Sequence, residues 1–221
     1  MPKAVIFDVD GTLVDSVDLH ARAWQEAFRD FGLDISFEDI RGQIGKGGDQ
    51  LMPVFLSQQM LQQQGEQLEK HRGGIFRRKY LPLVTGFAAV RALFQRLQRD
   101  GKQIALASSA KQDELETYKN IAGIADLVDT HTSSDDAEKS KPYPDIFQAA
   151  WQRLDAVEPG DVMVIGDTPY DAQAARSAGL RSIGMLCGGF PEAALQRAGC
   201  IAIYRDPADL LRNYDASPLA E

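Results

Sequence analysis

Residues 4–12 read AVIFDVDGT, and this stretch decides the fold. Its first four residues are apolar, a length that suits a strand and is too short for a buried helix. Unbroken apolar runs are typical of strands that are covered on both faces, as in a parallel sheet. The polar residues and the glycine that follow mark the point where the chain leaves the strand. We therefore expect Asp8 and Asp10 at the carboxyl end of a buried parallel strand.

Further apolar runs alternate with stretches of helical periodicity along the rest of the chain. The predicted strands are residues 103–107, 162–165 and 182–186, with weaker ones at 127–128 and 201–203. Helical stripes of apolar residues occupy 87–97 and 146–154. Strands that alternate with helices in this way predict an α/β core, in which helices cover both sides of a parallel sheet.

One long interval breaks this alternation, because residues 15–82 contain no good strand. A stripe over residues 20–31 predicts a helix that Gly32 ends, and Ser36 caps a short helix that reaches about Gly42. We therefore predict a helical domain, residues 15–82, inserted into a core of residues 1–14 and 83–221.

The second half of this interval predicts two more helices. The first follows the glycine-rich loop 45–48 and carries Pro53 in its first turn, where proline is tolerated. The second runs from about Glu66 to Tyr80, and Gly65 marks the break before it. At the other end of the chain, residues 215–221 have the character of a loose tail.

The 221 residues carry 24 lysines and arginines against 32 aspartates and glutamates, a formal net charge of −8. Such an acidic protein does not attract the phosphate backbone of nucleic acids, so we expect no nucleic-acid partner. No apolar run approaches the ~20 residues that span a bilayer, and the first apolar run is too short for a signal peptide. We expect a cytoplasmic protein with no membrane partner, monomeric or dimeric, in which Cys187 and Cys200 are buried free thiols.

The pair Asp8 and Asp10 is the strongest chemical signal in the chain. Ligands of α/β sheets gather at the carboxyl ends of the strands, and the two-residue spacing aims both side chains at the same side. One carboxylate can bind a hard cation and attack phosphorus, while the other protonates a leaving oxygen and later takes a proton from water. The alternative is an acidic turn after a strand, since Asp-Gly pairs are common in turns.

Serine and lysine residues later in the chain extend this pattern. Ser108 and Ser109 follow strand 103–107. A hydroxyl and backbone N–H groups there can hold a phosphoryl oxygen, or a serine can cap the helix that starts near Lys111. Lys141 is held in extended backbone by the proline after it. Its ammonium can neutralise a nucleophile and a transferring phosphoryl group, although most lysines lie on the surface.

A second acid pair, Asp167 and Asp171, follows the strand 162–165. Mg²⁺ prefers a few carboxylates, some waters and a phosphate oxygen, so the two acid pairs predict a magnesium site. Taken alone, the second pair also fits an acidic helix N-terminus that the helix dipole favours. The strand ends nevertheless supply an acid pair, a hydroxyl, a lysine and an acid pair in that order. A purely structural explanation of this pattern would require all of the alternatives above to be true at once.

The stretches FDVDGTLVDS, ASSA, KSKPYPDIF and GDTPYDAQAARSAG resemble the motifs of the haloacid dehalogenase-like superfamily of phosphohydrolases, and they extend from Phe7 to Gly179. The resemblance implies an α/β fold with a Rossmann-like parallel sheet core and an inserted all-helical cap domain, in agreement with the strand-free interval. It also implies Mg²⁺ as cofactor and a small phosphorylated metabolite as substrate.

The resemblance further assigns roles to individual residues. It implies that Asp8 is the nucleophile that forms an aspartyl-phosphate, that Asp10 is the general acid and base, and that Lys141 steadies the charges. The residues implied in phosphate binding are Gly11, Thr12, Ser108 and Ser109. The residues implied in metal binding are Asp8, Asp10 through its backbone carbonyl, Asp167, and Asp171 through a water or an outer contact.

Substrate selectivity is expected from the cap. His20 and Trp24 lie one helical turn apart, and DLHARAW resembles the cap entry of β-phosphoglucomutases and related sugar-phosphate phosphatases. Arg41 begins a stretch that resembles the Arg-x-x-x-Gly-x-Gly loop of phosphoglycolate-phosphatase-like members. This loop holds Lys46 at a helix start, where an anion can dock. A packed histidine and a solvated lysine are the alternatives.

The expected function is therefore that of a Mg²⁺-dependent phosphatase acting on a small phosphomonoester, either phosphoglycolate or a sugar phosphate. A sugar phosphomutase of the β-phosphoglucomutase type would use the same core residues. Asp10 makes a dehalogenase or a phosphonatase a poor match, because family members with those activities lack this acid. A signalling receiver domain does not place its phosphorylated acid in an Asp-x-Asp pair on the first strand and needs no helical insertion.

Overall fold

The computed structural model describes residues 1–220, and its core is a six-stranded sheet in the order β5-β4-β1-β6-β7-β8. All neighbouring strands in it are parallel. The strands are β1 (Ala4–Phe7), β4 (Gln103–Ala107), β5 (Thr130–Thr132), β6 (Val162–Gly166), β7 (Arg181–Met185) and β8 (Ala202–Tyr204). The predicted parallel α/β sheet is confirmed, with the all-apolar strand β1 inside it between β4 and β6.

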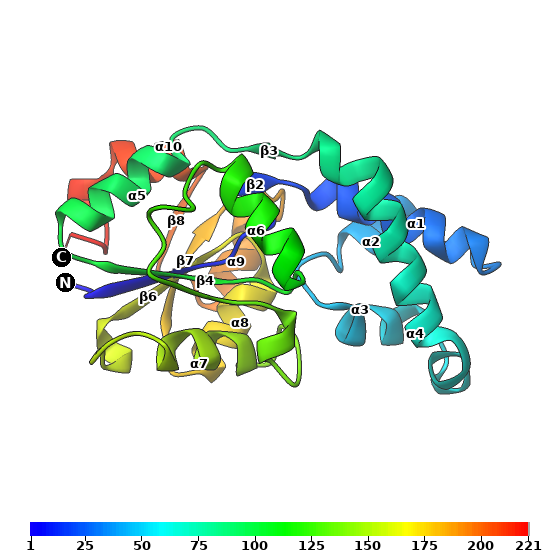
Figure 1. Cartoon of the computed structure of the whole chain (residues 1–221). Helices are drawn as coiled ribbons and strands as arrows, with labels where there is room; N and C mark the ends of the chain where they lie inside the picture. Colours follow the sequence, from blue (N-terminus) through cyan, green and yellow to red (C-terminus); the bar gives the residue numbers. More distant parts are fainter. Residues whose placement is uncertain (221) are drawn as a thin grey trace.

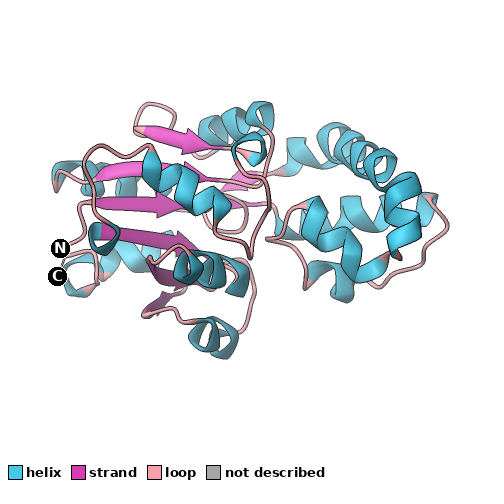
Figure 2. Ribbon diagram, turned by 90° about the horizontal axis from the view of Figure 1, so that it is seen from below, coloured by secondary structure: helices cyan, strands magenta, loops and turns pink. Residues whose placement is uncertain are grey.

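Helices cover both faces of this sheet (Figures 1 and 2). The core helices are α5 (Val90–Arg99), α6 (Gln112–Ile121), α7 (Asp145–Gln152), α8 (Pro169–Ser177), α9 (Glu192–Ala198) and α10 (Pro207–Arg212), with 3₁₀ turns at Ser134–Asp136, Pro159–Asp161 and Tyr214–Ala216. Successive side chains of β1 point to opposite faces. Val5 and Phe7 pack on the side of α5, and Ala4 and Ile6 pack on the side of α7. Burial on both faces explains why this strand contains no polar residue.

The helices α1 to α4 lie together beyond the carboxyl ends of the strands, and the strand arrows in Figure 2 point toward them. Their bounds are α1 (Val17–Asp30), α2 (Phe37–Arg41), α3 (Gly48–Phe55) and α4 (Gln58–Ile75), followed by a π-helical turn (Phe76–Tyr80) and a 3₁₀ turn (Leu81–Leu83). The short strands β2 (Val14–Asp15) and β3 (Thr85–Gly86), which the sequence did not predict, pair antiparallel and join both ends of the helical segment. The helical insertion is as predicted, whereas its boundaries at residues 15 and 82 stay a prediction.

Two details of the predicted cap helices are wrong. Gly65 does not mark a break, because α4 continues through it. A Cβ there would lie 3.8 Å from Leu61 Cδ2 and 4.0 Å from Met52 Cε of α3, which are ordinary contact distances. Pro53 lies in the second turn of α3 and not in its first. The predicted end of the last helix near Tyr80 agrees with the structure, because the π-helical turn continues α4 from Phe76 to Tyr80.

The weak strand predicted at residues 127–128 is also wrong. Leu127 lies in a turn, where its N–H donates to the carbonyl of Ile124 at 2.9 Å, and its side chain is buried. Its apolar character therefore reflects packing, and β5 begins only at Thr130. The helix expected near Lys111 has that lysine at its N-cap position and no side-chain cap, so neither serine before it caps the helix.

The C-terminal residues up to 220 are not a loose tail, because Ser217 and Leu219 are fully buried. Residue 221, the last of the predicted tail, lies outside the described residues. Cys187 and Cys200 are free thiols as predicted, but they are half-buried. Within residues 1–220, no helix combines the length and the apolar character needed to span a membrane.

Candidate active site

The loop after β1 places Asp8 and Asp10 at the carboxyl edge of the sheet. Asp8 continues the strand pairing, since its N–H donates to the carbonyl of Ile165 at 2.8 Å. Gly11 then takes a left-handed conformation with φ +79°, which glycine adopts without strain. A Cβ at this position would lie 2.4 Å from Asp167 Oδ2. This glycine therefore turns the chain and also lets a carboxylate from the neighbouring strand end approach.

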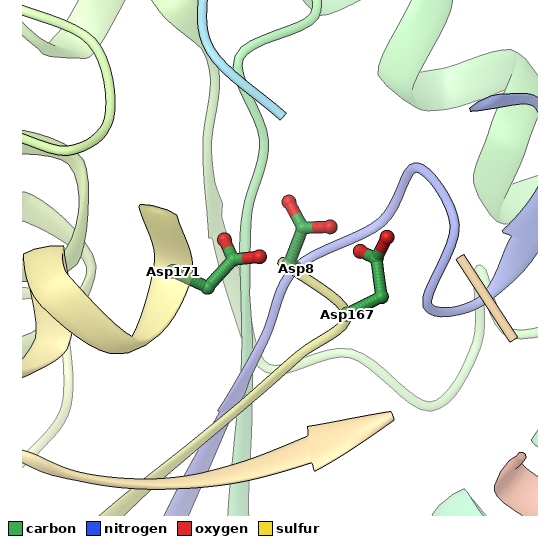
Figure 3. A group of neighbouring side chains, drawn as sticks. All are labelled: Asp8, Asp167 and Asp171. Carbon is green, nitrogen blue, oxygen red and sulfur yellow. The ribbon is translucent and has the colours of Figure 1, made fainter. Parts of the chain in front are cut away.

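Three carboxylates from separate elements meet at this edge (Figure 3). Asp8 follows β1, Asp167 follows β6, and Asp171 lies in the first turn of α8; one oxygen of each lies within 4.8 Å of the others. The Nζ of Lys141 donates to Asp8 Oδ1 and lies 2.8 Å from Asp171 Oδ1. It also donates to the carbonyl of Ala107 at 3.3 Å. Lys141 is only 1% exposed, so these groups form a buried ion cluster.

Burial shifts the protonation equilibria of this cluster. It raises the pKa of Asp8 to about 7; Lys141 opposes this rise, and the charges of Asp171 and Asp10 add to it. Burial and the charges of Asp8 and Asp171 also raise the pKa of Asp167 well above its usual range. Burial alone would lower the pKa of Lys141, but the charges of Asp171 and Asp8 raise it by more. The buried carboxylates therefore repel one another, and a bound cation would relieve that repulsion.

One oxygen of Asp167 has no partner. Its Oδ1 accepts a hydrogen bond from Thr12 Oγ1 at 3.0 Å, whereas Oδ2 is buried without a hydrogen-bond partner among residues 1–220. Gly11 and Gly188 make room for this oxygen, since a Cβ would lie 2.4 Å from it at Gly11 and 1.7 Å from it at Gly188. A buried carboxylate oxygen without a partner is costly. A hard cation is the partner that suits it, so the cluster fits a divalent metal.

The side chain of Asp10 turns one oxygen toward the cap. Its Oδ1 accepts from Ser16 Oγ at 2.6 Å and lies 2.9 Å from His20 Nε2. Ser16 directly precedes α1, and His20 lies in the first turns of that helix. The cap is therefore in direct contact with the second acid of the Asp-x-Asp pair.

A pocket lies between the cap helices and the strand ends. Its lining comprises Asp8, Asp10, Ser109, Ala110 and Glu114 from the core, and His20, Trp24, residues 44–48, Glu69 and Arg72 from the cap. The guanidinium of Arg72 lies over the ring of Trp24 at 4.8 Å, and the ammonium of Lys46 lies 4.6 Å from the ring of Tyr170. Groups of both charges thus line one pocket beside the acidic cluster, as expected for a site that holds a small polar molecule.

A family model covers most of the chain. The model of the haloacid dehalogenase-like hydrolases matches residues 2–179. The chain belongs to this family. Its predicted membership, and the prediction of a hydrolase, are thereby confirmed.

Relatives of this hydrolase match it over nearly its whole length. The chain is 27% identical to a phosphoglycolate phosphatase of Cereibacter sphaeroides over 220 residues, 94% of this chain and 97% of the relative. It is 30% identical to the protein SUPPRESSOR OF QUENCHING 1, chloroplastic, of Arabidopsis thaliana, over 96% of this chain but 20% of that longer protein. A hydrolase from Pseudomonas syringae, known from its crystal structure, matches with a TM-score of 0.89 at 27% identity, over 97% of this chain and 98% of that one.

The residues predicted to bind phosphate occupy different places in this hydrolase. Ser109 lines the pocket, and its buried Oγ has no partner among the described residues. Ser108 is fully buried, and its Oγ accepts from the N–H of Ala110 at 3.0 Å. The hydroxyl of Thr12 lies 3.3 Å from Asp8 Oδ2 and 3.0 Å from Asp167 Oδ1, and Gly11 forms the turn beside these carboxylates. Ser109 is therefore the predicted residue whose hydroxyl is free to meet a ligand.

The predicted metal-binding carboxylates are not equally available. Asp171 Oδ2 accepts from the N–H of Thr168 at 3.0 Å and from its Oγ1 at 2.6 Å, in a capping box that begins α8. Its Oδ1 contacts Lys141. The capping box thus holds Oδ2 of Asp171, whereas its Oδ1 lies against the ammonium of Lys141 and accepts no hydrogen bond among the described residues. Asp8 and Asp167 are therefore the carboxylates better placed for direct contact with a cation.

The predicted cap residues divide in the same way. Those that line the pocket are His20, Trp24 and Lys46. Arg41 does not belong to the described lining: its Nε donates to Asp18 Oδ1 at 2.7 Å, and its Nη2 donates to the carbonyl of Gly188 at 3.1 Å. Arg41 therefore ties the cap to the core.

Sequence reasoning missed Glu69, Arg72 and Glu114 in the pocket lining. Glu69 and Arg72 lie three residues apart on α4 and so share a helix face. That spacing is a usable signal, but α4 is polar on most of its surface, and nothing in its sequence shows which face meets the pocket. Glu114 lies in an ordinary acidic first turn of α6.

Proposed function

We propose that this hydrolase is a Mg²⁺-dependent phosphatase that hydrolyses a small phosphomonoester through an aspartyl-phosphate on Asp8. The observation that carries the proposal is the buried cluster beside the pocket. There the carboxylate of Asp8 contacts the ammonium of Lys141 and lies near the unpartnered oxygen of Asp167. A nucleophilic carboxylate, a fixed positive charge and a cation site made of oxygens are the groups that phosphoryl transfer requires.

Asp8, Asp167 and the backbone carbonyl of Asp10 would hold the Mg²⁺ ion, with Asp171 in contact through a water. The unpartnered Oδ2 of Asp167 and the repulsion among the buried carboxylates support this assignment. Bound Mg²⁺ supplies positive charge to the oxygens of the transferring phosphoryl group. Lys141 supplies the same kind of charge from the protein.

The remaining residues carry the two chemical steps. In the first, an oxygen of Asp8 bonds to phosphorus as the ester P–O bond breaks, and Asp10 gives a proton to the departing oxygen. In the second, Asp10 takes a proton from a water whose oxygen bonds to phosphorus, and the bond to Asp8 breaks to release phosphate. Ser109 and Lys141 stabilise the phosphoryl oxygens in both steps, with Ser108 behind them.

The cap residues His20, Trp24, Lys46 and Arg72 would contact the organic part of the substrate, a small phosphorylated metabolite such as phosphoglycolate or a sugar phosphate. The relative in Cereibacter sphaeroides that bears the name phosphoglycolate phosphatase supports the first choice. A sugar phosphomutase would use the same acids and lysine, and it differs in returning the phosphoryl group to a sugar.

Phosphate release across a panel of phosphomonoesters tests this function. The panel contains phosphoglycolate, hexose 1- and 6-phosphates and nucleoside monophosphates, assayed with Mg²⁺ and with EDTA. We expect release that EDTA abolishes and added Mg²⁺ restores, and a loss of at least ~10³-fold in Asp8→Asn, because this amide is not a nucleophile. Asp34→Asn makes the same chemical change at an exposed position and should retain full activity.

Activity that survives in Asp8→Asn, or in EDTA, would contradict the proposed nucleophile or the proposed metal. The same reaction mixtures distinguish the mutase. An isomerised sugar phosphate with little free phosphate would replace the phosphatase proposal by a phosphomutase.

A further inference from the structure

A chain of hydrogen bonds connects the cap to a buried residue of the core that lies outside the sequence motifs. His20 Nε2 of α1 lies 2.9 Å from Asp10 Oδ1 and 3.1 Å from the hydroxyl of Tyr118 on α6. That hydroxyl donates to Glu114 Oε1 at 3.0 Å. Tyr118 is 0% exposed, although it lies close to the pocket that Glu114 and His20 line. A fully buried phenol in this place needs an explanation beyond filling space.

The neighbours of His20 determine the orientation of its ring and which ring nitrogen carries the hydrogen. Its Nδ1 faces Arg72 Nη1 at 3.4 Å. A guanidinium has donors only, so Nδ1 accepts and the ring hydrogen resides on Nε2, between Asp10 and Tyr118. The ring of Phe76 stacks on the imidazole with a centroid distance of 3.9 Å and an interplanar angle of 7°. Phe76 therefore fixes the ring plane, and the polar neighbours fix the rotation of the ring within that plane.

Glu114 would compete with Asp10 for this hydrogen. Its Oε1 lies 3.9 Å from His20 Nε2, just beyond hydrogen-bond distance. The hydroxyl of Tyr118 contacts both groups, because it donates to Glu114 and its oxygen faces the imidazole N–H. Asp10 then keeps two donors on Oδ1, from Ser16 and His20, which leaves its other oxygen for the pocket that Asp10 lines.

We propose that Tyr118 is a positioning residue for the proton transfer by Asp10: its hydroxyl holds Glu114 away from His20, so that His20 holds the carboxylate of Asp10 toward the leaving oxygen of the substrate. The inference rests on the proposed phosphatase function. It adds a core residue outside the sequence motifs to the acid–base apparatus, and it makes that apparatus complete only when the cap helix α1 lies against α6.

The variant Tyr118→Phe tests this role, because it removes the hydroxyl and keeps the ring. The kcat/KM is compared for two substrates: an alkyl phosphate, whose leaving oxygen needs a proton, and 4-nitrophenyl phosphate, whose leaving group departs without one. We expect kcat/KM to fall about 10-fold for the alkyl ester and less than about 2-fold for the nitrophenyl ester, because general-acid help is lost only where it is needed. A purely structural role would lower both values equally.

A double variant tests the competition by Glu114. Adding Glu114→Leu to Tyr118→Phe removes the competing acceptor and should recover at least about half of the lost alkyl-ester activity. Tyr214→Phe is the matched control, since it removes the hydroxyl of a buried tyrosine that does not belong to the described pocket lining. It should leave the ratio of the two kcat/KM values unchanged. Thermal unfolding of each variant confirms that it is folded.

The outcomes separate this inference from the proposed function. If the unmodified enzyme turns over no phosphomonoester, neither these two nor any of the panel, both proposals fail. If it turns over both, and Tyr118→Phe lowers the two kcat/KM values equally or not at all, only the role of Tyr118 is overturned. Failure of the double variant to recover activity would also overturn the role given to Glu114.

Discussion

Gly188 shows how closely the acidic cluster is packed at the scale of one residue. A Cβ there would lie 1.7 Å from Asp167 Oδ2, far inside contact distance. We expect Gly188→Ala to displace this carboxylate and to raise the Mg²⁺ concentration for half-maximal activity at least about 10-fold, since overpacking costs about 1–3 kcal/mol. A Mg²⁺ titration of phosphate release measures this. Gly160→Ala, where a Cβ meets nothing within 4 Å, should leave the titration unchanged, and an unchanged titration in Gly188→Ala would argue against Asp167 as a ligand.

Single residues also show what the sequence could and could not predict. Asp8, Asp167 and Lys141 were identifiable because strand ends of a parallel sheet meet at one edge, so position along the chain determines proximity. Arg72 and Tyr118 were not identifiable, because their side chains become neighbours of the site only when the cap packs against the core. That packing depends on the whole surface of two domains and leaves no short motif.

At the scale of one element, α4 carries glycines inside a helix of 18 residues. A Cβ at Gly73 would meet nothing within 4 Å. We expect Gly73→Ala to stabilise the protein by about 0.5–1 kcal/mol, because alanine loses less backbone entropy in a helix. The melting temperature should rise by about 1–4 °C in a thermal scan. Gly101→Ala also meets open space, but its φ of +70° strains alanine, so this variant should melt lower.

The elements themselves differ in how well the sequence predicts them. Buried strands such as β6 were located to within a residue, because an unbroken apolar run has few other uses. The edge strand β5 was misplaced, since its residues are polar and the apolar pair before it packs in a turn. The continuous α4 was predicted as broken, because a glycine inside a helix looks the same in sequence as a glycine that ends a helix.

At the scale of the whole molecule, a few hydrogen bonds hold the cap against the core. Tyr170 OH of α8 donates to the carbonyl of Gly42 in the cap at 2.6 Å. On the other side of the cap loop, Ser140 Oγ accepts from the N–H of Gly47 at 2.9 Å, and the N–H of Ser140 donates to Asp49 Oδ2 at 3.1 Å. Ser140 directly precedes Lys141, so closure of the cap and the position of this lysine are connected.

We expect Tyr170→Phe to loosen this closure while keeping the ring that contacts Lys46 and Phe190. Loss of one hydrogen bond costs about 0.5–1.5 kcal/mol, so kcat/KM should fall by roughly 2- to 10-fold. Steady-state kinetics with the preferred ester measures this. Tyr143→Phe alters an exposed tyrosine and should have no effect. Equal behaviour of the two variants would mean that the bond to Gly42 does not contribute to closure.

The central place of β1 in the sheet has a consequence for synthesis on the ribosome. This strand emerges before both of its sheet partners, because its register pairs Ala4 with Gln103 on one side and with Val162 on the other. Its apolar side chains therefore have no sheet partners during this part of synthesis. The cap helices can already pack, because their contacts are closer in sequence. Asp8, the proposed nucleophile, is translated long before its acidic neighbours, and it acquires them only after Asp171 has been added. A nascent chain that stalls before this point exposes an apolar strand and lacks the complete acidic cluster. We expect chaperones to bind such a chain.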